Sequence, residues 1–370
     1  MRGVESPAAS SLSAHESSPR VVLVTGAAGF IGANAVAWLL REQSHVRVIS
    51  FDAMTYAAHP NSLAMATRGH ASRHHFVRGD VRDGASLAAV LAGGVADGDG
   101  RATPRPDVVW HLAAETHVDR SILDPRVFVD SNVNGTMRVL EAIRAARDAG
   151  HAVRYVHVST DEVYGALTAD EAPFTEDHAL APSSPYAASK AASDLLVQAW
   201  AKSFELDAVI TRCSNNYGPF QFPEKLIPLM VTRALAGASL PVYGDGRQVR
   251  DWLHADDHVA ALWAVTQSNA SGGRVFNIGA SAERENLAIV HGILDALGRD
   301  RSLVTHVRDR PAHDRRYAMD ATRLRAETGW TPRVSFEQGL AATVQWYVAN
   351  EPWWRAVECE SSRAAEALYL

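Results

Sequence analysis

Short apolar runs alternate with longer segments of helical spacing in the first part of the chain, and this alternation restricts the fold more than any other feature. The runs lie at Val21–Thr25, Val46–Phe51, Asp107–His111, Arg154–Ser159 and Ala208–Cys213. Strands that alternate with helices pair in parallel and are covered on both faces. The sequence therefore predicts an α/β fold with a doubly wound parallel sheet.

The pattern loosens beyond about residue 215, where short strands near Val275 and Thr305 are joined by long loops and helices. We interpret 20–214 mainly as the sheet domain and 215–355 mainly as a smaller C-terminal, substrate-binding lobe, some of whose segments return to the first domain. Such a lobe at the carboxyl ends of the strands would form the second wall of a cleft. The remaining segments, 1–19 and 356–370, are expected to be tails, and the first of them to be disordered.

Composition excludes several classes of protein. Across 370 residues, 47% are hydrophobic and 21% charged, with a net charge of -6, which is typical of a soluble globular protein and gives no indication of nucleic-acid binding. We expect no signal peptide or membrane segment, because no apolar run reaches the length of about 18 residues. Cys213 and Cys359 are too few for a disulfide framework or a cysteine-based metal site, so we expect no metal and a cytoplasmic location.

A glycine-rich turn follows the first predicted strand directly. Gly26, Gly29 and Gly32 are spaced three apart and open a helix that includes Phe30 and Ile31. Glycines in this position allow a tight turn and a close approach of a pyrophosphate, and the helix N-terminus offers free N–H groups. The context of strand, turn and helix predicts a Rossmann-like dinucleotide site.

Two acidic residues end the next strands. Asp52 lies about twenty residues beyond Gly32, where an acid can accept hydrogen bonds from an adenosine ribose. No arginine follows immediately to hold a 2′-phosphate, so the pattern favours NAD over NADP. Asp80, with Val81, follows a strand near Phe76 and is a candidate adenine contact. An ordinary strand-end aspartate is the alternative for both positions.

Polar side chains also follow the strand that ends at Ser159, namely Thr160, Asp161 and Glu162. Further along, Tyr186 and Lys190 lie one turn apart on the same face of a predicted helix. A tyrosine titrates near ~10, so it acts as a base at neutral pH only if a cation stabilises its phenolate. In a chain with a dinucleotide fold, a lysine at this spacing indicates a hydride-transfer pair.

The glycine turn together with Tyr186 and Lys190 resembles the extended short-chain dehydrogenase/reductase superfamily. Several blocks are similar specifically to the dTDP-glucose 4,6-dehydratase family, and the resemblance runs from about Val21 to Trp354. The blocks are Leu112–Ser121, Ser159–Gly165, Cys213–Pro219, Pro223–Pro228, Arg250–His254 and Arg310–Tyr317.

The resemblance implies roles for the polar residues. Tyr186 would remove the hydroxyl proton at sugar C4 while the hydride passes to NAD+, which leaves a 4-keto sugar with an acidic C5 proton. Glu162 would abstract that proton, protonated Asp161 would donate to the departing C6 hydroxyl, and the hydride would return to C6. Two adjacent carboxyls with opposite roles need environments that separate their pKa values.

The resemblance also assigns binding residues. Those expected around NAD, besides the glycine turn, are Asp52, Ala53, Met54, Thr55, Asp80, Val81, Ala113, Ala114, Thr116, Ser131, Tyr186, Lys190 and Asn216. Those expected around the nucleotide sugar are Thr116, Thr160, Asn215, Lys225, Leu226, Pro241, Tyr243, Arg250, Asn277, Arg310 and His313. Arg250 is the expected diphosphate clamp, since guanidinium geometry suits bidentate phosphate contacts.

Two positions depart from the family pattern. Ala58 and Ala312 stand where the family usually has glycine, in segments expected to contact adenosine and the nucleotide base, respectively. Neither change removes a catalytic group. The two changes therefore concern contacts to the adenosine and to the nucleotide base, and not the reaction.

Three alternatives remain open at this point. A UDP-glucose 4,6-dehydratase would need the same acid and base. A nucleotide-sugar 4-epimerase or decarboxylase would share the turn and the Tyr–Lys pair, but would not need Asp161. A non-catalytic nucleotide-sensing protein would have no reason to keep all four polar residues. By resemblance we also expect a homodimer, in which the helices at 130–149 and 186–204 pack into an intermolecular four-helix bundle.

Overall fold

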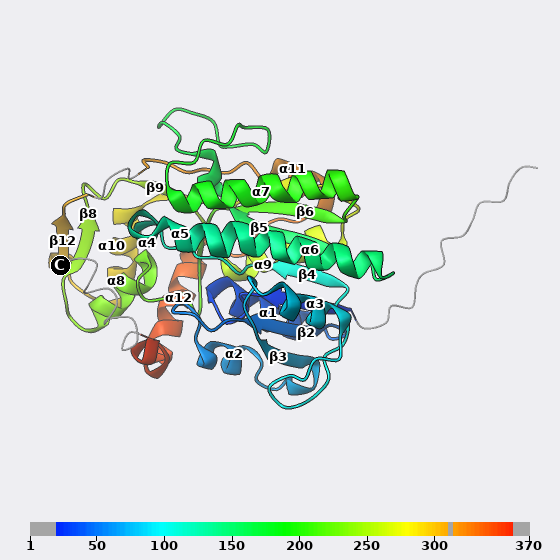
Figure 1. Cartoon of the computed structure of the whole chain (residues 1–370). Coiled ribbons are helices and arrows are strands. Elements are labelled where there is room, and N and C mark those ends of the chain that lie inside the picture. The colour runs from blue at the N-terminus through cyan, green and yellow to red at the C-terminus, as the bar shows by residue number, and fades with distance from the viewer. Residues whose placement is uncertain (1–19, 310–313, 358–370) are drawn as a thin grey trace, which may run out of the picture.

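The computed structural model describes residues 20–309 and 314–357, and its centre is a seven-stranded sheet (Figure 1). The strands follow the order β10-β6-β5-β4-β1-β2-β3, and all six pairings are parallel. Their bounds are β1 Val21–Thr25, β2 Arg47–Asp52, β3 His74–Arg78, β4 Val108–His111, β5 Arg154–Thr160, β6 Ala208–Cys213 and β10 Arg274–Ile278. The predicted fold class is confirmed. The direction of winding reverses between β1 and β4, so the ligand crevice is expected at their carboxyl ends.

Helices cover both faces of the sheet because its strands are apolar on both sides. In β1, Val22 and Val24 belong to one buried cluster and Val21 and Leu23 to another. The first cluster is covered by α1 (Phe30–Glu42), α9 (Ala255–Gln267) and α11 (Thr322–Thr328), and the second by α3 (Gly84–Ala92), α6 (Gly135–Asp148) and α7 (Pro185–Phe204). Such continuous apolar runs are typical of parallel strands buried on both faces.

A second group of elements forms its own core beside one end of the sheet (Figure 1). Its helices are α8 (Leu226–Leu235), α10 (Asn286–Leu297) and α12 (Phe336–Ala349), and its strands are β7 (Asn215–Tyr217), β8 (Leu240–Tyr243), β9 (Val249–His254), β11 (Glu283–Glu285) and β12 (Val304–Val307). Because β7 begins two residues after β6 ends, this group starts at the carboxyl edge of the sheet. Val357, from the segment expected to be a tail, packs into the same core.

The chain crosses between the two groups more than once. Although they lie beyond residue 215, α9 packs against α1, and β10 pairs with β6. The shorter helical elements are α2 (Pro60–Ala66), α4 (Val118–Leu123), α5 (Pro125–Phe128), the π-helical turn η2 (Val129–Asn134), and the 3-10 turns η1 (Ala71–Arg73), η3 (Asp161–Tyr164) and η4 (Arg301–Leu303). In the two described ranges, no helix combines the length and apolar character needed to cross a membrane.

Candidate active site

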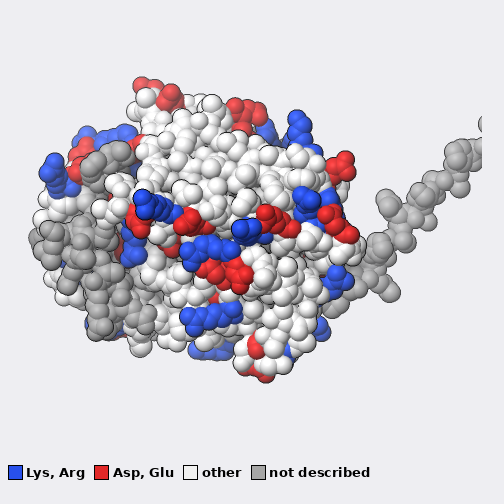
Figure 2. Space-filling view, in the orientation of Figure 1, with Lys and Arg blue, Asp and Glu red and all other residues white. Residues whose placement is uncertain are grey.

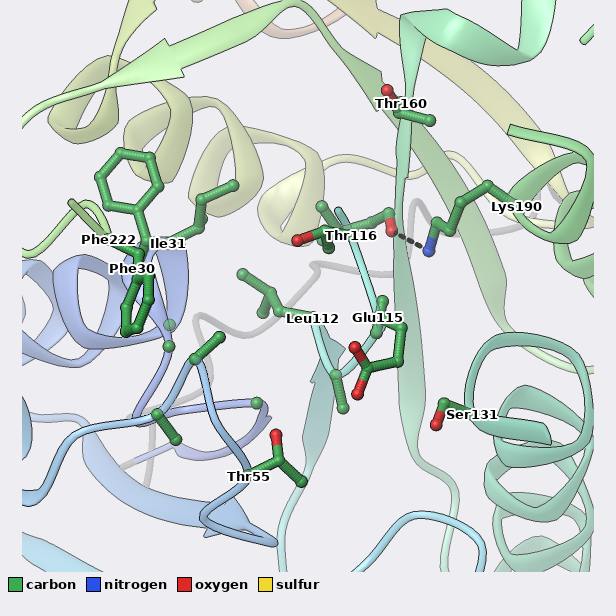
Figure 3. A pocket seen from close by; sticks show the side chains of 18 of the residues that line it. Phe30, Ile31, Thr55, Leu112, Glu115, Thr116, Ser131, Thr160, Lys190 and Phe222 are labelled. Carbon is green, nitrogen blue, oxygen red and sulfur yellow. Dashed lines mark hydrogen bonds between the residues drawn. The ribbon is translucent and has the colours of Figure 1, made fainter. Parts of the chain in front are cut away.

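A cavity of about 500 Å³ opens at the carboxyl edge of the sheet, where the sequence analysis placed the site (Figure 3). Loops that follow β1, β2, β3, β4, β5 and β6 all contribute to its wall, together with the first turns of α1 and α7. Parallel strands that end at one edge bring together side chains that are far apart in the sequence.

The glycine turn lies at one end of this cavity and leaves no room for a β-carbon at Gly26 or Gly32. Gly26 has a φ of +69°, and a Cβ placed on Gly32 would lie 2.0 Å from the Gly26 carbonyl oxygen. The N-cap of α1 is Gly29, whose missing side chain supplies no capping hydrogen bond. The first N–H groups of α1 can therefore donate to an external anion, as a pyrophosphate site requires.

Asp52 and Asp80 lie where the sequence placed them, at the ends of β2 and β3. The Asp52 carboxylate accepts the Ala28 N–H at 2.9 Å and the Met54 N–H at 2.7 Å, so it also fixes the glycine turn. Asp80 pairs with Arg82 at 2.5 Å, and that pairing lowers the pKa of the Asp80 carboxyl. Both acids line the cavity, and Asp52 remains a ribose ligand by prediction.

Tyr186 and Lys190 enter the cavity from the first two turns of α7, which Ser184 caps through the Ala187 N–H. The Lys190 ammonium donates to the Val158 carbonyl at 2.7 Å (Figure 3). Burial raises the pKa of the Tyr186 hydroxyl well above its ordinary value, and nearby Glu162 raises it further. A buried tyrosine of this kind ionises only when positive charge is supplied next to it.

Asp161 and Glu162 form the start of η3, directly beyond β5, and both line the cavity. Asp161 is 3% exposed, whereas Glu162 is half-buried. Burial raises the pKa of the Asp161 carboxyl to about 8, with a further contribution from neighbouring Glu162 and opposition from Arg250. Asp161 thus holds a proton at neutral pH, which is the state a proton donor needs.

Most residues expected around the cofactor face the cavity. Besides the glycine turn and the groups just described, its wall includes Ala53, Thr55, Val81, Ala113, Ala114, Thr116, Ser131 and Asn216. Met54 is not part of that wall; it adopts a φ of 58° and packs against the core cluster under α1. Ala58 lines the cavity without a left-handed backbone, so its β-carbon is accommodated.

The residues expected around the nucleotide sugar divide into three groups. Thr116, Thr160, Asn215 and Lys225 line the cavity. Leu226, Pro241, Tyr243, Arg250 and Asn277 lie outside its wall, and Arg310, Ala312 and His313 fall outside the described residues. Arg250 stacks on the Tyr317 ring at 4.4 Å and donates to the carbonyls of Val249 and Asp314. Asn277 accepts from the Tyr164 hydroxyl and donates to the Phe174 carbonyl.

Several cavity residues had not been singled out from the sequence. Glu115 and Glu224 both carry carboxyls whose pKa is raised by burial, and Cys213 lies beside Tyr186 at the end of β6. Further examples are Arg82, Ser159, Ser214, Gln221 and Phe222. Five of these eight residues, namely Glu115, Ser159, Cys213, Ser214 and Glu224, belong to the sequence blocks quoted for the resemblance. Their position next to an assigned residue was therefore the available signal. Among the described residues, no cluster of His, Cys, Asp and Glu could hold a metal ion.

The fold and the site together define a class. A doubly wound sheet with a glycine turn at its first crossover, and a Tyr-x-x-x-Lys pair facing the same cavity, is the arrangement of a short-chain dehydrogenase/reductase. The adjacent carboxyls of Asp161 and Glu162, at the end of β5, face the same cavity.

Comparison with known proteins resolves this class further. A family model described as GDP-mannose 4,6 dehydratase matches residues 23–343. A dTDP-glucose 4,6-dehydratase of Xanthomonas campestris pv. campestris (strain B100) is 47% identical over 352 residues, covering 90% of this chain and 95% of that protein. A dTDP-glucose 4,6-dehydratase of Streptomyces griseus is 50% identical over 336 residues, with the same two coverages of 90% and 95%.

A solved structure agrees with these relatives. The crystal structure of a double mutant of DesIV, a dTDP-glucose 4,6-dehydratase from Streptomyces venezuelae with NAD and a nucleotide sugar bound, matches with a TM-score of 0.82. It shares 45% identity, and the match covers 91% of this chain and 99% of that one. The chain belongs to the dTDP-glucose 4,6-dehydratase family, and the resemblance stated from its sequence is confirmed.

Proposed function

We propose that this protein converts dTDP-glucose to dTDP-4-keto-6-deoxyglucose and uses NAD as a resident cofactor. The proposal rests on one observation, which is that Asp161, Glu162, Tyr186 and Lys190 line the same cavity. Oxidation at C4 needs Tyr186 and Lys190. Loss of water across C5 and C6 needs Asp161 and Glu162 in addition, and the raised pKa of Asp161 fits its role as the acid.

The glycine turn and Asp52 fit a dinucleotide, because the close packing at Gly32 and the uncapped start of α1 suit a pyrophosphate. When bound, NAD supplies the acceptor for the C4 hydride and gives that hydride back at C6. NAD is bound in the solved relative named above. The polar wall formed by Thr55, Asp80 and Ser131 would hold the rest of the cofactor.

Each protein group then has one proton to move. The Tyr186 phenolate, stabilised by the Lys190 ammonium, takes the proton of the sugar C4 hydroxyl as the C4–H bond breaks. Glu162 takes the C5 proton, which the new C4 carbonyl has made acidic. Asp161 gives its proton to the C6 oxygen, which leaves as water, and the resulting double bond receives the hydride at C6 and a proton at C5. The neutral Asp161 and the ionised Glu162 are thus the states in which the elimination begins.

A direct test is to incubate the purified protein with dTDP-glucose and with UDP-glucose separately and to follow loss of water by mass spectrometry. We expect water loss from dTDP-glucose at the higher rate. Faster reaction of UDP-glucose would keep the chemistry and change the base assignment, whereas no loss from either substrate would reject the proposal.

We also propose a homodimer, located in the cytoplasm. Large apolar side chains are exposed together along α4, α5, η2 and α7, and Figure 2 shows few charged side chains over α7. They are Ile122, Leu123, Val127, Val129 and Leu195, with exposed fractions from 39% to 64%. A contiguous apolar surface rimmed by charge is typical of a subunit interface.

Light scattering should give the dimer mass for the wild type and the monomer mass for Leu195→Glu, and a monomeric wild type would reject the interface.

A further inference from the structure

Helix α7 carries a third ionisable side chain behind its two cavity residues. Tyr186, Lys190 and Asp194 follow one another at intervals of one turn and share a helix face. Lys190 is 4% exposed and Asp194 is fully buried, at 0%. A buried carboxylate at this position is costly unless several groups around it stabilise its charge.

The contacts of Asp194 join three parts of the site wall. Its Oδ2 accepts from Arg212 Nε of β6 at 2.8 Å, and its Oδ1 lies 3.5 Å from His157 Nε2 of β5. Burial raises the pKa of the Asp194 carboxyl, and Arg212 is the largest influence that opposes this rise. Asp194 is therefore packed against the strand ends that carry the catalytic groups.

Among the groups that act on Lys190 in the described structure, Asp194 is the anion that most favours its protonated form; it lies one helical turn away and accepts a hydrogen bond from Arg212. From β4 and β5, His111 and His157 face it, and burial lowers the pKa of His111 to about 3 and that of His157 well below its ordinary value, so both rings are neutral. From β6, Cys213 faces it as a neutral thiol, since burial raises the pKa of that thiol to about 12.

The remaining charged groups near Lys190 have their own partners or are neutral. Arg212 is a second cation and is paired with Asp194. Tyr186, one turn earlier on α7, is neutral until it reacts. Burial lowers the pKa of the Lys190 ammonium to about 8, and Asp194 is the largest influence in the opposite direction. Without Asp194, two buried cations would share this region with no anion.

We propose that Asp194 is a positioning residue that keeps Lys190 protonated beside Tyr186 during C4 oxidation. The proposal rests on the function proposed above, because it concerns the same Tyr–Lys pair. Asp194 does not touch the cavity and acts on the reaction only through Lys190. Its removal should convert Lys190 to the neutral amine at a lower pH, and the Tyr186 phenolate would then lose its stabilising cation.

The expected signature lies in the pH profile. Asp194→Asn should move the acid limb of kcat for dTDP-glucose dehydration upward by about one pH unit, as removal of a nearby charge does. At pH values on the acid side of the profile, kcat of the variant should be about tenfold lower than that of the wild type. At alkaline pH the two kcat values should converge. The KM for dTDP-glucose should stay unchanged, because Asp194 lies outside the cavity wall.

A second variant guards against misfolding, since Asp194→Asn leaves Arg212 buried without its partner. The double variant Asp194→Asn/Arg212→Gln removes both charges, and neutral replacement of a buried ion pair is often tolerated. It should show a shift in the same direction, but a smaller one, because one of the two cations has been removed together with the anion. Asp257→Asn is the matched control: this buried aspartate of α9 accepts the N–H groups of Arg333 and Val334 far from Lys190 in sequence.

The outcomes separate the two proposals. An unshifted limb in a folded Asp194 variant, or a uniform loss of rate at every pH, would overturn the role of Asp194. An upward shift in both Asp194 variants but not in Asp257→Asn supports it. A wild-type protein that does not dehydrate dTDP-glucose at any pH would instead overturn the proposed function.

Discussion

Replacement of Asp161 by asparagine should stabilise the folded protein, by an amount that grows with pH. Asp161 is 3% exposed, and burial raises the pKa of its carboxyl from 3.8 to about 8. In the unfolded chain the same carboxyl ionises near 3.8, so between the two values the unfolded state gains from releasing a proton that the folded state retains. Stability is therefore lost as pH rises through this window.

The size of the effect follows from the shift. Each unit of pKa difference corresponds to about 1.4 kcal/mol, so a shift of about four units costs the wild type on the order of 5 kcal/mol above pH 8. Asparagine has nearly the same shape and no charge at any pH. The free energy of unfolding of Asp161→Asn should thus equal that of the wild type near pH 4 and exceed it increasingly up to pH 8.

Urea titrations followed by tryptophan fluorescence measure the difference in free energy of unfolding between Asp161→Asn and the wild type at a series of pH values. The protein concentration is held fixed, because the protein is expected to be a dimer. Asp257→Asn again provides the control, since its carboxylate accepts two backbone N–H groups and its loss should destabilise the protein. A difference between Asp161→Asn and wild type that does not change with pH would refute the argument that Asp161 is protonated in the folded state.

Three further predictions concern catalysis and the glycine turn. Glu162→Gln should abolish water loss from dTDP-glucose while C4 oxidation persists, which would appear as NADH absorbance; normal dehydration would contradict its role as the base. Tyr186→Phe should lower kcat by about 100-fold or more with little change in KM, the usual contribution of a positioned base, and a variant of nearly normal kcat would move the base elsewhere. Gly32→Ala should lower the urea midpoint of unfolding strongly, because its β-carbon would lie 2.0 Å from the Gly26 carbonyl oxygen. Gly29→Ala, whose β-carbon would lie 3.4 Å from that oxygen, should fold normally. Equal midpoints for the two variants would show that the turn is not tightly packed.

Local patterns predicted those parts of the structure that depend on neighbouring residues. The strand at Val21–Thr25, the turn after it and the helix from Phe30 form one contiguous unit, and their order leaves few alternatives. Tyr186 and Lys190 were predicted to share a helix face because helical spacing places residues four apart on one side, and both line the cavity. The resemblance extended these observations to Asp161 and Glu162.

Other parts of the site depend on contacts that no local pattern encodes. The raised pKa of Asp161 comes from its burial at the end of β5, and Arg250, which opposes the rise, lies about ninety residues further along the chain. The environment of Lys190 is built from β4, β5 and β6, whose side chains meet only after the sheet has formed. The resemblance assigned Met54 to the cofactor, but its side chain packs against the core.

The central claim is that one cavity removes a hydride from C4 and returns it to C6 of the same sugar. Incubation with dTDP-glucose that carries deuterium at C4, followed by NMR of the product, tests that claim most directly. We predict a 4-keto-6-deoxy sugar in which the deuterium is found at C6. Deuterium that remains at C4, as an epimerase would leave it, or that is lost to water, would contradict the account.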